Sequence, residues 1–182
     1  MIKTSDILDE KDKHLRAKNK DVTFPLSKER KKLIDDMLEH LYYSQIEKFA
    51  LKYDLRPCMG LAAPQMGINE RFFVICHEET EGNFKNYVII NPKMISHSEE
   101  LIYAAEGEGC LSVNRDVPGI VPRYARATFT GYDINGNPIK FRVREELSIA
   151  FQHEFDHLNG IMFYDHIDPK DRYKNKDYMR EI

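Results

Sequence analysis

One short motif constrains the fold of this chain more than any other part of its sequence. The stretch QHEFDH, residues 152–157, contains H-E-x-x-H, in which His153 and His157 are four residues apart. On a helix such residues lie on one face, with their Cβ atoms roughly 5–6 Å apart. Two imidazoles so placed can bind one divalent metal ion, and Glu154 beside them can act as a general base. The motif therefore predicts a helix whose histidine face points into the protein.

A catalytic metal centre of this kind takes about three protein ligands and leaves one position open. A downstream ligand is poorly supported, because Phe163 stands where one class of H-E-x-x-H enzymes has its third histidine. Upstream, Cys110 lies in GEGCLS, residues 107–112, where glycines allow a tight turn. A thiolate binds divalent metals strongly, so Cys110 is the favoured third ligand, with Cys58 as a weaker alternative. Cys76 ends a buried apolar run and is expected in the core.

The stretch CMGLAAPQ, residues 58–65, combines small residues with a carboxamide. Small residues let a backbone approach a substrate closely. Gln65 offers two N–H donors, which can stabilise an oxyanion that develops during a reaction.

The remaining pattern indicates both helices and strands. Residues 1–25 are expected to form a short polar helix and an extended arm, and Ser27 is expected to cap a helix that ends before Pro57. The apolar stripe of that helix consists of Leu33, Met37, Leu38, Leu41 and Phe49. A final helix is predicted from Glu146 to Leu158, stopped by Gly160.

Strands are predicted at 72–76 and 87–90, with a polar loop over residues 78–84 between them. Two more, within 126–134 and 138–143, flank Asn135-Gly136, which favours a hairpin turn. We expect an α+β fold in which short antiparallel strands and sheets pack around a buried helix in the C-terminal half that carries H-E-x-x-H.

The composition limits the classes of function that this chain can have. The 182 residues suit a single domain, residues 1–182, with a charged tail over 169–182. The net charge of -3 and the lack of a basic stripe argue against direct reading of nucleic acid. No apolar run approaches the roughly 18 residues of a membrane span. Three cysteines form no disulfide framework, so we expect a cytoplasmic protein, and no large apolar surface stripe suggests more than a monomer.

In this order and at these separations, GLAAPQ, EGCLS and QHEFDH resemble the three signature motifs of the peptide deformylase family. The resemblance covers roughly residues 55–168. The longer segments near 40–57 and 77–87 resemble the insertions of the type common in Gram-positive bacteria. That family removes the formyl group from the N-terminal methionine of new proteins.

The resemblance implies a role for several residues. Cys110, His153 and His157 would hold one divalent metal ion, Fe(II) in cells, with Zn(II), Ni(II) or Co(II) also able to accept this donor set. Glu154 would take a proton as metal-bound water or hydroxide attacks the formyl carbonyl. The Gln65 side chain and the backbone N–H of Leu111 would bind the oxyanion.

For the substrate, a formyl-methionyl peptide or nascent chain, the resemblance places Gly60 and Gly109 along the peptide. The apolar pocket for the methionine is expected from Ile149 and Ala150, with Met59 at its mouth. Glu108 is either part of the site, paired with Arg123, or a surface acid. Transient contact of the charged tail with a ribosome is left open.

One residue departs from the family pattern: Cys58 replaces the first glycine of G-x-G-L-A-A, which puts details of the substrate groove in doubt. Two other functions stay open. A metal-dependent peptidase or amidase would cleave a different substrate, and a structural Cys-His-His site would require a fourth protein ligand.

Overall fold

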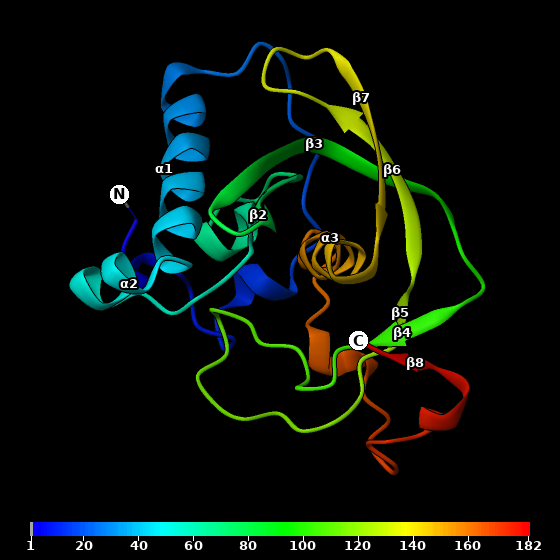
Figure 1. Cartoon of the computed structure of the whole chain (residues 1–182). Helices are drawn as coiled ribbons and strands as arrows, with labels where there is room; N and C mark the ends of the chain where they lie inside the picture. The colour runs from blue at the N-terminus through cyan, green and yellow to red at the C-terminus, as the bar shows by residue number, and fades with distance from the viewer. Residues whose placement is uncertain (1) are drawn as a thin grey trace.

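The helix that carries the H-E-x-x-H motif, α3 (Glu145–His157), runs through the middle of the molecule, and curved strands pass around it (Figure 1). The computed structural model describes residues 2–182 of the chain. Five strands form one antiparallel sheet, in the order β1-β2-β3-β6-β7. They are β1 (Gly60–Ala62), β2 (Phe72–Thr80), β3 (Asn83–His97), β6 (Arg126–Tyr132) and β7 (Pro138–Arg144). The expected mixture of helices with antiparallel sheets is confirmed.

A second, smaller sheet has the strand order β5-β4-β8. Its strands are β4 (Leu101–Tyr103), β5 (Arg123–Tyr124) and β8 (Arg180–Glu181). The pairing of β8 with β4 is parallel, which departs from the antiparallel expectation. Residues 171–178 are exposed, and the chain then returns to the protein and adds β8 to this sheet.

The two faces of α3 have different surroundings. Phe151 is fully buried and packs on Phe73 and Phe129 of the large sheet, with ring centroids 5.4 Å away in both cases. His153 follows two residues later, about 200° further around the helix. Because the aromatic face is held by the sheet, the histidine face is turned toward the loops on the other side.

The predicted Asn135-Gly136 hairpin joins β6 to β7, and Gly136 has the positive φ of 84° that such a turn requires. The prediction of a polar loop over residues 78–84 is wrong. There β2 continues to Thr80 and β3 begins at Asn83, so only a tight turn lies between them. The polar side chains suggested a loop because the ends of both strands project into solvent beyond the core.

The single helix expected after Ser27 is two helices. α1 (Lys28–Ser44) begins as predicted, with the Ser27 side chain accepting the Arg30 N–H at 3.1 Å. It ends before Ile46, whose backbone is extended, and α2 (Glu47–Tyr53) follows. The apolar stripe is therefore shared between two helices.

The N-terminal arm contains short 3₁₀ turns instead of the expected polar helix. The 3₁₀ turns of the chain are η1 (Thr4–Asp6), η2 (Lys13–Arg16), η3 (Ala63–Met66), η4 (Phe163–His166) and η5 (Lys176–Tyr178). Asn19 donates from Nδ2 to the carbonyl oxygens of His157 and Leu158, both at 3.3 Å, so the arm supports the end of α3. Within residues 2–182, no helix is both long and apolar enough to cross a membrane.

Candidate metal centre and active site

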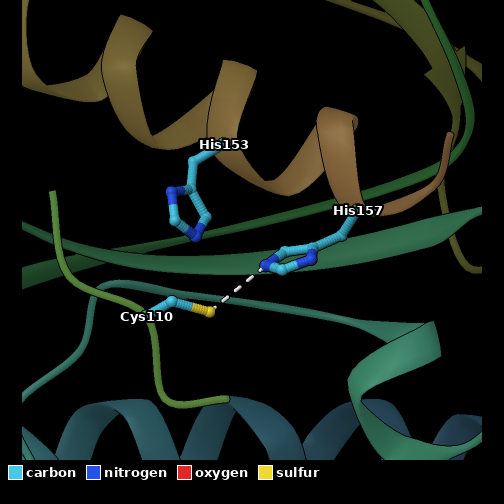
Figure 2. Close-up of side chains that lie close together, drawn as sticks. All are labelled: Cys110, His153 and His157. Carbon is cyan, nitrogen blue, oxygen red and sulfur yellow. Dashed lines mark hydrogen bonds between the residues drawn. The ribbon is translucent and has the colours of Figure 1, made fainter. Parts of the chain in front are cut away.

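Three side chains from separate parts of the chain converge beside α3. His153 and His157 extend from one face of the helix with ring centroids 5.0 Å apart, and Cys110 approaches them from its loop (Figure 2). Cys110 Sγ lies 3.4 Å from Nε2 of His157, and the ligand atoms of the three residues all lie within 4.8 Å of one another. One thiol and two imidazoles suit a borderline divalent metal ion. The three predicted ligands form a metal-binding site.

Glu108 sets the orientation of the His153 ring. Its Oε2 lies 2.8 Å from Nδ1 of His153, so Nδ1–H can donate to the carboxylate and Nε2 is left for a metal ion. Burial opposes the charge on Glu108, but Arg123 and His153 overcome it and lower the pKa of the carboxyl group to about 2. Glu108 is therefore ionised at neutral pH.

Arg123 lies behind this pair and is only 3% exposed. Its guanidinium donates to both oxygens of Glu108, at 2.7 and 2.9 Å, and to Asp156 at 2.6 Å. Burial opposes the charge of Arg123, but these two carboxylates raise its pKa above the usual value. Of the two possibilities for Glu108, the pairing with Arg123 is the one observed, while the part played by Asp156 was not predicted.

Glu154 is buried beside the histidines, with 3% of its surface exposed. Burial raises the pKa of its carboxyl group to about 7. Within residues 2–182, Oε2 of Glu154 has no hydrogen-bond partner. A Cβ added at Gly60 would lie 2.4 Å from Oε1, so the glycine leaves just enough space for the carboxylate. A carboxyl group with a pKa near neutrality suits proton transfer in both directions.

Gln65 is 2% exposed and its carboxamide is held in one orientation. Oε1 accepts the Ala62 N–H at 2.9 Å, which leaves Nε2 to donate on the other side. Nε2 donates to Ser112 Oγ at 3.2 Å and lies 3.5 Å from Cys110 Sγ. The N–H donors of Gln65 therefore face the metal-binding site.

The loop that carries Cys110 is held from outside by Arg56. This guanidinium donates to the carbonyl oxygen of Leu111, and to that of Val113 at 3.2 Å. Leu111 itself is 6% exposed. The positions of Arg56 and Ser112 in the site were missed from the sequence, since nothing in their spacing shows that they contact the loop.

A cavity of about 500 Å³ adjoins the metal-binding site. Its lining includes every residue predicted to bind substrate: Met59, Gly60, Glu108, Gly109, Ile149 and Ala150. The carboxylate of Glu108 is turned to Arg123 and His153, so this residue has no free charge for a substrate. A Cβ at Gly109 would meet no atom within 4 Å, which leaves open space on that side.

Cys58, the weaker alternative ligand, is outside the group of metal ligands. Its Sγ donates to the carbonyl oxygen of Gly60 at 3.0 Å, and burial raises the pKa of the thiol. Among residues 2–182 the only group of three or more ligand side chains is Cys110, His153 and His157. A fourth donor that would close the site is absent from this group.

The site combines a buried H-E-x-x-H helix, three metal-ligand side chains and an adjoining cavity within a mixed helix-and-sheet fold. These features are typical of the class of metal-dependent hydrolases. Comparison with known proteins gives the family. The family model for polypeptide deformylase matches residues 4–173. The chain belongs to the peptide deformylase family, as its three motifs predicted.

Individual relatives cover almost the whole chain. The chain is 49% identical to the peptide deformylase of Macrococcus caseolyticus, over 96% of this chain and 95% of that one. Identity to the peptide deformylase of Shouchella clausii is 51%, over 92% of each chain. The crystal structure of peptide deformylase from Thermotoga maritima matches with a TM-score of 0.70 at 33% identity, over 90% of this chain and 97% of that one.

Proposed function

We propose that this chain removes the formyl group from the N-terminal methionine of formyl-methionyl peptides and nascent proteins. The observation that supports this most is the position of Glu154. It is buried beside a three-ligand metal site and against Gly60, and its pKa is raised to about 7. In a chain of the peptide deformylase family, that arrangement fits hydrolysis of a small, unhindered amide.

The proposed cofactor is one divalent ion, Fe(II) in cells, with Zn(II), Ni(II) or Co(II) as alternatives. The donors fit such an ion: burial lowers the pKa of His157, which keeps its imidazole neutral, and Glu108 leaves Nε2 of His153 available. When bound, the ion supplies Lewis-acid chemistry, which polarises a carbonyl group and makes water a better nucleophile near pH 7.

Glu154 is the proposed general base and then the general acid. It accepts a proton from the attacking water and delivers one to the amine that leaves. A carboxyl group of ordinary pKa would be a poor proton donor at neutral pH, whereas burial brings the pKa of Glu154 into the working range.

Gln65 and Leu111 are proposed to bind the oxyanion that forms on the former formyl oxygen. The bond from Ala62 holds the Gln65 carboxamide with its N–H donors toward the site before any substrate arrives. Arg56 holds the carbonyl oxygen of Leu111 and thereby fixes the adjacent peptide groups. Donors held in place in this way need no reorganisation during the reaction.

The substrate is proposed to lie along Gly60 and Gly109, with its methionine side chain in the cavity beside Ile149 and Ala150 and Met59 at the mouth. The narrow space between Gly60 and Glu154 favours a formyl group, whose carbon carries only hydrogen, over an acetyl group.

We further propose that residues 1–182 act as one monomeric cytoplasmic domain, with no direct binding to nucleic acid or membrane. Transient contact with the ribosome would bring the site to its substrate.

The test uses protein purified without air, with its metal content measured. Formate release from formyl-Met-Ala-Ser is expected, with far slower release of acetate from acetyl-Met-Ala-Ser and no cleavage of an internal peptide of similar sequence. Glu154→Ala should keep the metal and lose nearly all turnover, and full activity in that variant would exclude Glu154 as the base. Comparable cleavage of the internal peptide would instead favour a general peptidase.

A further inference from the structure

We propose that residues 180–182 form one wall of the substrate cavity, and that Ile182 limits which side chain can follow the formyl group. This inference rests on the proposed function, because the cavity receives a side chain only if the chain binds a formyl-peptide. It assigns a specificity role to a segment that lies outside all three sequence motifs.

The backbone of this segment is held as a strand. β8 pairs in parallel with β4, beside which it lies in Figure 1. Beyond β8, the N–H of Ile182 donates to the Tyr103 carbonyl at 3.0 Å, and Ala105 N–H donates to the Ile182 carbonyl at 2.9 Å. Both the N–H and the carbonyl oxygen of Ile182 are therefore bonded to the segment that contains β4, which fixes the position of its backbone.

Side chains hold the same segment to α3. Arg180 donates to both oxygens of Glu145, at 2.7 and 2.8 Å, and to Glu100 at 2.9 Å. Glu145 is the first residue of α3 and itself lines the cavity. These exposed ion pairs are individually weak, but three hydrogen bonds from one planar guanidinium give it a defined position.

The Ile182 side chain belongs to the cavity wall. Together with Ala104, it packs against a small apolar cluster that includes Ile149, and all three residues line the cavity. Alternation along a strand puts Arg180 and Ile182 on the same side. Their partners on α3, Glu145 and Ile149, are four residues apart and also share a face. The segment 180–182 and α3 therefore contact each other through two successive pairs of residues, one charged and one apolar.

This geometry predicts a preference among substrate side chains. Ile182 occupies space that a bulky aromatic side chain would need, whereas an unbranched methionine side chain can bend into the remaining volume. In an apolar pocket, one methylene group changes kcat/KM by roughly 10–200-fold. Removing most of the Ile182 side chain should therefore favour a larger residue.

The experiment compares kcat/KM for formyl-Phe-Ala-Ser and formyl-Met-Ala-Ser, with the full metal-loaded chain. In Ile182→Ala, the Phe:Met ratio should rise by at least about tenfold, mainly through KM. Arg180→Ala should shift the ratio in the same direction by less, because Ile182 loses its anchor. Tyr178→Ala is the matched control, since Tyr178 lies two residues before Arg180 and is 87% exposed, and it should leave the ratio unchanged.

An unchanged ratio in Ile182→Ala, with wild-type metal content and melting temperature, would overturn the inference. If the wild-type chain releases no formate from either peptide, the proposed function fails instead. Equilibrium binding of the products Met-Ala-Ser and Phe-Ala-Ser then decides the role of Ile182. A shift of the Kd ratio toward Phe in Ile182→Ala would support it, and no shift would refute it.

Discussion

Replacing Gly60 by alanine should separate the position of the catalytic carboxylate from the stability of the fold. The added Cβ would lie 2.4 Å from Oε1 of Glu154 and 2.8 Å from its Cγ, whereas ordinary contact begins at 3.4 Å. The carboxylate must therefore move by about 1 Å, and a misplacement of that size can cost about 100-fold in rate, or about 2.7 kcal/mol. Since Oε1 is the end of a flexible side chain, the backbone can stay in place and the protein should still fold.

The assay measures kcat and KM for formyl-Met-Ala-Ser, together with metal content and melting temperature. Gly131→Ala is the matched control, because its Cβ would lie 2.6 Å from Ile89 Cγ1 and 2.8 Å from the Ile90 carbonyl oxygen. That overpacking should destabilise the sheet by about 1–3 kcal/mol while kcat of the folded protein stays the same. The reasoning is refuted if Gly60→Ala keeps kcat within twofold of wild type at unchanged melting temperature and metal content.

Three further changes have expected outcomes. Gln65→Leu should lower kcat about 10²–10³-fold by removing an oxyanion donor, with metal content unchanged; wild-type kcat would exclude that role. Arg123→Met leaves the Glu108 carboxylate buried without its cation, so chemical denaturation should show a loss of about 3–5 kcal/mol, and a loss below about 1 kcal/mol would contradict the pairing. Burial lowers the pKa of His40 in the folded state, so protons bind the unfolded state more tightly and stability should fall as the pH drops below about 6.5. His40→Gln should reduce that slope in denaturation curves measured between about pH 7 and 5, and an unaltered slope would rule out this contribution.

The metal ligands could be predicted because their spacing carries physical information. His153 and His157 are four apart, and a helix brings such residues to one face whatever surrounds them. Cys110 was found because it directly follows Gly107-Glu108-Gly109, where glycines allow a tight turn, and because the downstream positions offered no good alternative. Short-range periodicity and the chemistry of each residue type were sufficient for this part of the site.

The supporting contacts could not be predicted, because they join residues whose separation follows no local rule. Arg123 and Asp156 are 33 residues apart and meet only after β5 and α3 have packed together. The break between α1 and α2 could not be predicted either, since it contains neither glycine nor proline. There Gln45 donates to the carbonyl oxygens of Leu41 and, across to β2, of Cys76, so tertiary contacts accompany the end of the helix.

The contacts of the last few residues also could not be predicted from the sequence. Arg180 lies in a mostly charged stretch that resembles a solvated tail, yet it bonds Glu145 and Glu100, which lie far from it in the sequence. Composition describes the average behaviour of such a stretch and does not show that its last residues pair with β4.

Crystallography of protein prepared without air, with diffraction recorded at the absorption edge of its metal, tests the proposed site most directly. We expect one ion bonded by Cys110 Sγ and by Nε2 of His153 and His157, with its remaining coordination position facing the cavity. A sulfur atom turned away from the ion, or a fourth protein side chain in that remaining position, would contradict the proposed hydrolytic centre.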